Sequence, residues 1–394
     1  LSGEIGAAGS SDNCYHVVVS VSDANTTVLD GFTISGGNAN GTDGLTVEGM
    51  SVFRHSGGGV YNNSSSPGIA NCMFSGNTAG GAGAGYGGGM FNFSTSLPSL
   101  TNCTFSSNSA SLGAGMYNSI PSSPTMNGCI FSGNSAAFFG GGMLNYSATP
   151  TLTNCLFSGN SAGASGGGMS SNFNSAPVLM NCTFSGNKSG SGGGGMENIS
   201  STPTLTNCIV WNNRVGSTTG SANANIYNSS STPVVTYSLI QNITDGTNNN
   251  LNGSTHASNS NYPDFVTPLD PATAPSTAGD FHVTACSPVV NIGATVGAPI
   301  VDLFGNARPF GEAVDFGVHE LQTAQTFPVA VCQNVAAVLT AAGTATLDPA
   351  SVNNNSTGCQ PLTLSVAPST FNCSHWGTPQ TVTLTVTGIN NVSS

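Results

Sequence analysis

A repeat of about 26 residues constrains this chain more than any other feature of its sequence. Six cysteines recur at intervals of 31, 26, 26, 27 and 26 residues, and a phenylalanine follows each of the first five by two positions. Methionines keep the same spacing. The columns are Cys72, Cys103, Cys129, Cys155, Cys182 and Cys208, then Met90, Met116, Met143, Met169 and Met196, then Phe74, Phe105, Phe131, Phe157 and Phe184. Such a chain grows by stacking one unit on the next.

Each unit is predicted to contain three short strands. Leu152 and Asn154 share one face, Cys155 and Phe157 share another, and the face switches between Asn154 and Cys155. A bend at asparagine explains the switch, because asparagine tolerates the left-handed conformation of a tight corner. Gly, Ser, Asn and Thr dominate without a 3.6-residue period, which excludes helices. We therefore expect an all-β fold, a right-handed parallel β-helix whose coils stack at about 4.8 Å with the three columns inside.

Two asparagine columns accompany the repeat. The first is predicted to form a corner ladder of amide-to-amide hydrogen bonds, which Gly128 interrupts. The second column follows each phenylalanine. The members are Asn71, Asn102, Asn154, Asn181 and Asn207, then Asn77, Asn108, Asn134, Asn160 and Asn187.

The chain is expected to divide near residue 322. The β-helix covers 1–322 with roughly nine to twelve coils. It includes regular coils at 57–242, loops at 39–56 and 243–260, and a closing segment at 261–322. Residues 323–394 alternate apolar and polar positions, as the strands of a small β-sandwich do.

Several strings resemble known secreted families. The repeated Gly-Gly-Gly-Met-x-Asn and Asn-Cys-x-Phe-Ser-Gly-Asn strings resemble the repeats of polymorphic outer-membrane-type surface proteins. Segment 263–320, which ends in Val-Asp-Phe-Gly-Val-His-Glu, resembles the closing segment of the choice-of-anchor Q β-helix family. These resemblances cover about residues 1–322. They imply secretion and anchoring at the surface of a Bacteroidota-like bacterium, with no catalytic residues to carry over.

Residues 323–394 resemble hyalin-repeat-like, immunoglobulin-type modules and lack the last strands of such modules. The resemblance implies a disulfide between Cys359 and Cys373 and leaves Cys332 without a partner. Cys14 and Cys286 belong to neither the column nor the sandwich, and we do not expect them to pair with each other.

The charges exclude several functions. Four basic residues cannot neutralise a nucleic-acid backbone, and no apolar run approaches the ~18 residues of a membrane-spanning helix. Residues 72–211 contain one glutamate, Glu197, one lysine, Lys188, and no Asp, His or Arg. Many β-helices are polysaccharide lyases or hydrolases. Glycoside hydrolysis needs two carboxylates about 5 to 9.5 Å apart, and a lyase needs a base and usually a clamped cation. We therefore expect no enzymatic activity and a solvated Glu197.

The densest ionisable cluster has two interpretations. It is either a cation or ligand site, or a cap that closes the open end of the β-helix through a pair between Arg308 and Asp302 or Asp315, and the cap is favoured. The cluster is Asp302, Arg308, Glu312, Asp315, His319 and Glu320. A second, acidic group lies near the other end, where Ca²⁺ is the one cofactor considered, although no regular calcium repeat is present. Its members are Asp12, Asp23, Asp30, Asp43 and Glu48.

The cysteine column has three interpretations: a metal ladder, a chain of disulfides, or buried thiols that serve as small apolar groups. Metal sites favour closely spaced cysteine pairs, and disulfides between stacked parallel strands are strained. The sequence therefore favours buried thiols.

The favoured function is a secreted, non-enzymatic surface protein, either an adhesin-like stalk or the subunit of an extracellular filament. Its partners would be other copies of the chain, cell-surface or matrix components, or glycans. A carbohydrate-binding protein is the alternative, if an aromatic stripe that Leu144, Ser170 and Glu197 interrupt points outward. The aromatic residues considered are Tyr61, Phe91, Tyr117, Tyr146, Phe173 and Tyr227. A polysaccharide lyase or hydrolase is disfavoured.

Overall fold

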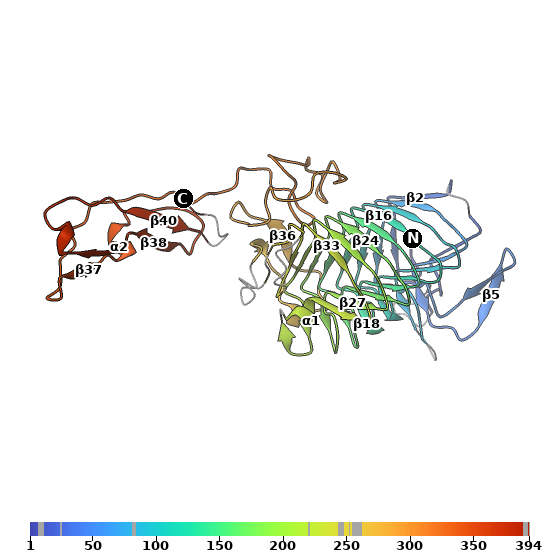
Figure 1. Cartoon of the computed structure of the whole chain (residues 1–394). Helices are drawn as coiled ribbons and strands as arrows, with labels where there is room; N and C mark the ends of the chain where they lie inside the picture. Colours follow the sequence, from blue (N-terminus) through green and yellow to red (C-terminus); the bar gives the residue numbers. More distant parts are fainter. Residues whose placement is uncertain are drawn as a thin grey trace.

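The computed structural model describes residues 1–6, 12–23, 26–80, 84–219, 221–242, 248–251, 253, 262–388 and 393. Most of the predicted loop 243–260 lies outside these residues. The chain forms a β-solenoid followed by a C-terminal module that projects away from it (Figure 1). The expected all-β parallel solenoid is confirmed.

Four sheets run along the solenoid, each with eight strands. The first contains β1 (Val18–Val21), β7 (Val60–Asn63), β11 (Met90–Phe93), β15 (Met116–Asn118), β19 (Met143–Tyr146), β23 (Met169–Asn172), β27 (Met196–Ile199) and β32 (Ile226–Ser229). The second contains β2 (Val28–Asp30), β8 (Gly68–Ala70), β12 (Ser99–Thr101), β16 (Thr125–Asn127), β20 (Thr151–Thr153), β24 (Val178–Met180), β28 (Thr204–Thr206) and β33 (Val234–Thr236).

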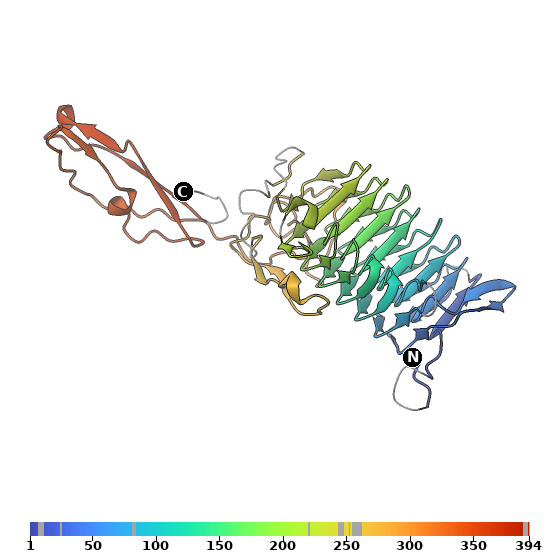
Figure 2. The ribbon, with the colours of Figure 1, turned by 90° about the horizontal axis from the view of Figure 1, so that it is seen from below.

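The third sheet contains β3 (Thr33–Ser35), β9 (Met73–Ser75), β13 (Thr104–Ser106), β17 (Ile130–Ser132), β21 (Leu156–Ser158), β25 (Thr183–Ser185), β29 (Ile209–Trp211) and β34 (Leu239–Ile240). The fourth contains β4 (Asn38–Ala39), β10 (Thr78–Ala79), β14 (Ser109–Leu112), β18 (Ser135–Phe139), β22 (Ser161–Ala162), β26 (Lys188–Ser189), β30 (Arg214–Val215) and β31 (Thr218–Thr219). Within these four sheets, β31 is the one strand that pairs antiparallel. Figure 2 shows the stacked coils from another side.

A coil therefore has four strands, and the predicted three are wrong. The fourth strand arises because the chain turns again two residues after each phenylalanine of the column. Gly76 turns it with a φ of 63°, and Asn77 then leads into β10. Only glycine adopts this left-handed conformation without a steric cost. Eight strands per sheet also fall short of the nine to twelve coils expected from the sequence.

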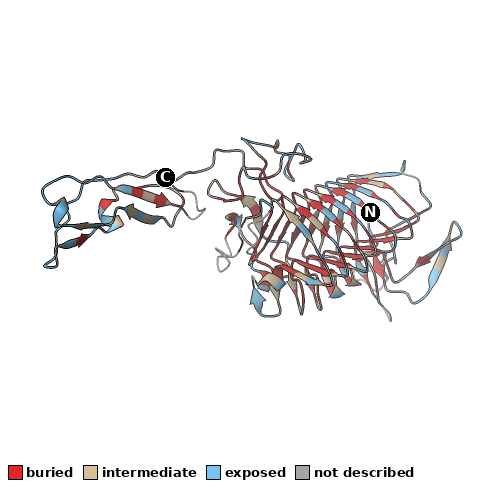
Figure 3. Ribbon diagram, viewed as in Figure 1, coloured by how far each residue is buried: buried red, intermediate tan, exposed pale blue. Residues whose placement is uncertain are grey.

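The interior is filled by columns of like side chains. Figure 3 shows buried positions recurring from coil to coil along the solenoid. Met90 pairs in register with Met116, and Phe105 with Phe131. The phenylalanine rings stack with centroids 4.3, 4.7, 4.6 and 4.5 Å apart and with planes within 4° of parallel. The six cysteines of the column are buried, and none forms a disulfide. Parallel pairing in register places equal side chains one rung apart, which makes this stacking possible.

The second asparagine column is continuous and buried. The Asn134 Oδ1 atom accepts from the backbone N–H of Asn108 at 3.1 Å and from its Nδ2 at 2.9 Å. Asn134 in turn donates to the Oδ1 of Asn160 and to the carbonyl of Phe105. The same amide-to-amide bond joins Asn160 to Asn187 and Asn187 to Asn213. This column supplies partners to backbone groups at a buried corner, which would otherwise be costly to desolvate.

The corner column behaves differently from the prediction. Its asparagines are left-handed, with φ between 51° and 54°, as expected for a corner. Amide-to-amide bonds are present between Asn102 and Asn71 and between Asn207 and Asn181. Asn154 instead donates to the carbonyl of Val301 at 2.8 Å. The ladder, predicted with an interruption at Gly128, is thus also broken between Asn154 and Asn181, because both amides donate to carbonyls of the closing segment.

Two further segments cover the outside of the coils. The predicted loop 39–56 contains a hairpin of β5 (Gly44–Val47) and β6 (Met50–Phe53) that packs on the first sheet. The closing segment contains β35 (Phe265–Thr267), the 3-10 helix η1 (Pro271–Thr273) and β36 (Asp280–Val283). A short helix, α1 (Ala222–Asn225), precedes β32.

The C-terminal module contains two small antiparallel sheets. One pairs β37 (Thr344–Thr346) with β39 (Thr370–Asn372), and the other pairs β38 (Thr363–Ala367) with β40 (Thr383–Thr387). Two short helices, α2 (Pro349–Val352) and η2 (Cys373–His375), complete it. Leu347, Val352, Leu384 and Val386 form its small core. The immunoglobulin-type topology stays a prediction.

Candidate functional site

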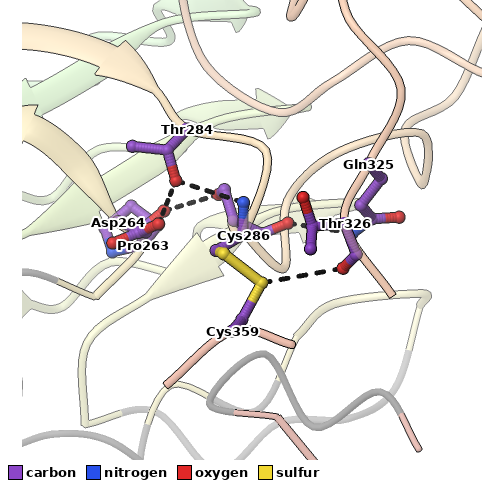
Figure 4. The surroundings of a disulfide bond; sticks show 8 residues. Pro263, Asp264, Thr284, Cys286, Gln325, Thr326 and Cys359 are labelled. Atoms are coloured by element: carbon purple, nitrogen blue, oxygen red, sulfur yellow. Dashed lines mark hydrogen bonds between the residues drawn. A yellow bond between two sulfur atoms is a disulfide. The ribbon is translucent and has the colours of Figure 1, made fainter. Parts of the chain in front are cut away.

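The disulfide of the chain joins Cys286 to Cys359, so the expected pair of Cys359 and Cys373 is wrong (Figure 4). The chain returns past the turn after β36, where the backbone N–H of Thr326 donates to the carbonyl of Ala285 at 2.8 Å. Thr357 then pairs with Val329 and brings Cys359 beside Cys286. Cys373 is exposed and free because the pairing of β37 with β39 places it next to Gly343.

Five members of the ionisable cluster of the closing segment are buried together, but not with the expected pairing, and the sixth, Glu312, is exposed. Arg308 faces Glu320, with 3.6 Å between Nε and Oε2, and donates to the carbonyl of Gly317 at 2.8 Å. The carboxylates of Asp302 and Asp315 are not paired with the guanidinium of Arg308, because each accepts hydrogen bonds from backbone N–H groups instead. Asp302 accepts from Phe304, Asn306 and Glu320, and Asp315 accepts from Asn291 and Leu321.

This cluster lies on the flank of the solenoid and does not close its end. Asn181 donates to the carbonyl of Asp315 at 3.0 Å, and the Thr183 hydroxyl accepts from the N–H of Val318. The third sheet presents apolar side chains here, among them Leu156 and Trp211, and the closing segment buries them. The closing segment therefore covers the side of the solenoid, and the prediction that the cluster caps the open end is wrong. At the end itself, Leu251 pairs with Leu239.

Burial dominates the protonation of this cluster. It raises the pKa of Asp315 to about 7, with Glu320 as a second cause, and it raises the pKa of Glu320. It lowers the pKa of His319 to about 4 and that of Arg308 below its usual value. The carboxylate oxygens are occupied by protein donors, so the arrangement is that of a buried latch between the closing segment and the coils.

The acidic group near the N-terminus does not assemble into one site. Asp43 forms an exposed ion pair with Arg54 at 3.0 Å, Asp30 accepts from Asn71 at 2.8 Å, and Asp23 accepts from Ser20. Within the described part of the chain, no three His, Cys, Asp or Glu side chains lie where they could hold a metal ion.

Glu197 is buried, with 2% of its surface exposed, so the expected solvated position is wrong. It points outward from the first sheet, but the glycine-rich connections form an extra ladder over it through Ser165 and Gly192. The Ser170 hydroxyl donates to its Oε2 at 2.7 Å, and burial raises its pKa. A second carboxylate is lacking beside it on the coils, since residues 72–211 contain no other.

The aromatic stripe is mostly covered. Tyr61, Phe91 and Tyr117 point away from the interior but are buried beneath Tyr86 and the hairpin of β5 and β6. They therefore do not form the open platform that the alternative function requires. Farther along the same sheet, Tyr146 is half-buried and Phe173 is 56% exposed, with ring centroids 4.6 Å apart. Tyr227 is half-buried.

The C-terminal module has an open groove with a volume of about 1130 Å³. Leu339, Phe371, Trp376 and Val382 line it together with polar residues. The lining contains one free thiol, Cys332, and one imidazole, His375.

A third asparagine column was not assigned from the sequence. Asn62, Asn92, Asn118 and Asn145 are buried on the first sheet and bond through their amides at 2.8, 2.8 and 2.9 Å. The asparagine two residues after Met90, Met116 and Met143 was the available signal. The period-two pattern places it on the same side of the strand as the methionine, toward the interior.

The family model of the right-handed β-helix region matches residues 10–164 and, in an overlapping alignment, residues 87–235. No curated protein and no solved structure matches the chain. Among the described residues, no helix has the length and apolar character needed to cross a membrane.

Proposed function

The chain belongs to the right-handed β-helix family, and we propose that it is a non-enzymatic structural protein of the bacterial cell surface or the extracellular space. In this proposal the solenoid is a rigid shaft and the C-terminal module is carried at one end of it. The shaft serves as an adhesin-like stalk or as the subunit of an extracellular filament.

The observation that carries this proposal is the set of unbroken columns along the solenoid axis. The buried amide column extends from Asn77 through Asn187 to Asn213, with both the backbone and the side chain of each asparagine bonded to the next rung. The phenylalanine stack follows the same path from Phe74 to Phe184. Bending the shaft would break several rungs of both columns together, which suits a load-bearing rod.

The scarcity of reactive groups on the coils supports a non-enzymatic role. Glu197 is buried and bonded to Ser170, and Lys188 is the only other charged residue between positions 72 and 211. Acid and base chemistry on a sugar requires two positioned groups.

The disulfide supports a role in which the module is held in place. Cys286 lies in the closing segment that packs on the coils, and Cys359 lies in the module. Disulfides persist in oxidising compartments, which agrees with an extracellular location. A covalent joint between shaft and module transmits force in a stalk and fixes the geometry between neighbouring subunits in a filament.

Electron microscopy of the native protein at the cell surface tests the structural role. Fibres with an axial repeat that matches one chain identify a filament subunit, and isolated rods identify a stalk. Labelling of intact cells with an antibody against the chain tests the location. Globular particles, or a signal only after lysis, would contradict the proposal.

An assay of product release tests the non-enzymatic part. The purified chain is incubated with neutral and acidic polysaccharides, and reducing ends and unsaturated products are measured. We expect no release. If release occurs and the Glu197→Gln variant abolishes it while keeping the fold, the chain is an enzyme.

A further inference from the structure

We propose that Tyr146 and Phe173 form a binding platform for a neutral polysaccharide on the flank of the solenoid. This site goes beyond the structural role proposed above. It lies at the corner where strands of the first sheet end, on the two adjacent rungs that contain β19 and β23.

The backbone at Phe173 is the first observation. The residue directly after a strand of the first sheet adopts a left-handed φ of 48° to 56° in six coils besides that of Phe173, and in all six it is serine. These residues are Ser22, Ser64, Ser94, Ser147, Ser200 and Ser230. Phe173 occupies the same corner with a φ of 55°, a conformation that bulky side chains rarely adopt. Strained residues of this kind gather at binding sites.

The exposure of the ring is the second observation. Phe173 is 56% exposed, and its only described ring contact is with Tyr146, at 4.6 Å and an interplanar angle of 41°. Fold stability does not explain this position, because serine satisfies the same corner in the other coils. Together the two rings present an apolar surface that spans two rungs, or about 5 Å between strands.

The polar surroundings specify the ligand. The Ser147 hydroxyl donates to the carbonyl of Phe173 at 2.7 Å, and Asn174 and Ser200 are exposed beside the rings. Glu197 is the acidic group of this region, but it is buried under the glycine-rich ladder and bonded to Ser170. Among the described residues, the platform therefore offers an exposed aromatic ring, hydroxyls and an amide without an exposed charge.

A pyranose ring matches this combination. Its C–H face packs on an aromatic ring, and its hydroxyls exchange hydrogen bonds with serine and asparagine side chains. A charged polysaccharide would find no countercharge here and would meet a protein of net charge −12. Several such weak contacts between one polymer and many copies of the chain would together bind more tightly than any single contact.

Affinity electrophoresis tests the site, because the acidic chain migrates in native gels and weak binding slows it. The gels contain barley β-glucan, galactomannan or arabinoxylan as neutral probes and polygalacturonate as the charged probe. We expect at least one neutral probe to retard the wild type and polygalacturonate to leave it unchanged. Phe173→Ser is expected to weaken the retardation about tenfold without lowering the thermal midpoint, because it restores the serine of the other corners.

Phe138→Ser is the matched control, because Phe138 on β18 is 53% exposed but belongs to the fourth sheet. It is expected to bind like the wild type, as is Phe173→Trp. Three outcomes overturn the site: no neutral probe retards the wild type, the two serine variants behave alike, or only polygalacturonate retards the chain. Concentration-dependent sedimentation that Phe173→Ser abolishes would assign the platform to a second copy and also overturn the site.

Discussion

Cys286 and Cys359 are 73 positions apart in sequence, and their Cα atoms lie 5.5 Å apart across the disulfide. One cysteine belongs to the cover of the coils and the other to the C-terminal module. The same junction includes the hydrogen bond from Gln325 Nε2 to the carbonyl of Ser287 at 3.0 Å. The covalent bond is therefore part of a larger contact between the shaft and the module.

Removal of this disulfide should destabilise the module more than the coils. For a loop of this length, we expect the Cys286→Ser/Cys359→Ser variant to lose about 2–4 kcal/mol of unfolding free energy. Differential scanning calorimetry should show the module melting earlier while the transition of the coils is retained. Cys373→Ser is the control and should change the stability by less than about 0.5 kcal/mol.

Peptide mapping without reduction checks the connectivity directly. Chymotrypsin suits this experiment, since the chain contains only four Lys and Arg residues. A fragment that links Cys359 to Cys373 would refute the pairing with Cys286.

The buried amide column should be sensitive to single substitutions. Asn134→Ala would leave the N–H and the Nδ2 of Asn108 without their acceptor. Each buried group without a partner costs about 1–3 kcal/mol, so we expect a loss of about 2–5 kcal/mol in chemical denaturation. Asn127→Ala, at an exposed position of the second sheet, should cost less than about 0.5 kcal/mol. Equal losses in the two variants would show that the column adds no stability.

The thiols should separate into two classes. Burial raises the pKa of Cys155 in the column, whereas Cys332 and Cys373 are exposed. Because the thiolate is the reactive form, iodoacetamide should label Cys332 and Cys373 in the native protein. Mass spectrometry should find the six column cysteines labelled only after denaturation. Native labelling of Cys155 at a similar rate would contradict a closed interior.

The latch should give opposing contributions to stability as the pH changes. The pKa of Asp315 rises from 3.8 to about 7 on folding, so the folded chain retains a proton that the unfolded chain has lost. The stability from this group is full below pH 3.8 and is lost as the pH rises toward 7. The pKa of His319 falls from 6.5 to about 4, so its contribution increases from pH 4 to pH 6.5.

Single substitutions should separate the two contributions. In Asp315→Asn, the denaturation midpoint should rise between pH 4 and pH 6.5, because the contribution of His319 to stability remains. In His319→Gln, it should fall between pH 4 and pH 7. The wild type should change less than either variant over the shared window. Parallel curves for all three proteins would show that neither group titrates differently in the folded state.

Much of the solenoid could be predicted because its information is local and repeated. The spacing of the Cys, Met and Phe columns indicates the coil, and the switch of face at Asn154 indicates a corner. The fourth strand was missed because it is only two residues long in several coils, too short for an alternation to be seen. Glu197 was misplaced because its cover is a glycine-rich ladder whose sequence has no apolar signal.

The coil and its interior columns follow from the sequence, because they rest on contacts that recur about every 26 residues. The scarcity of charge between residues 72 and 211 can be read from the same sequence. The partner of Cys359, the pairing of Arg308 with Glu320 and the exposure of Phe173 emerge only in the folded chain. These features depend on how the hairpin and the closing segment pack on the coils and on how the module is joined to the closing segment. Such contacts join residues far apart in sequence and occur once, so no repeat reveals them.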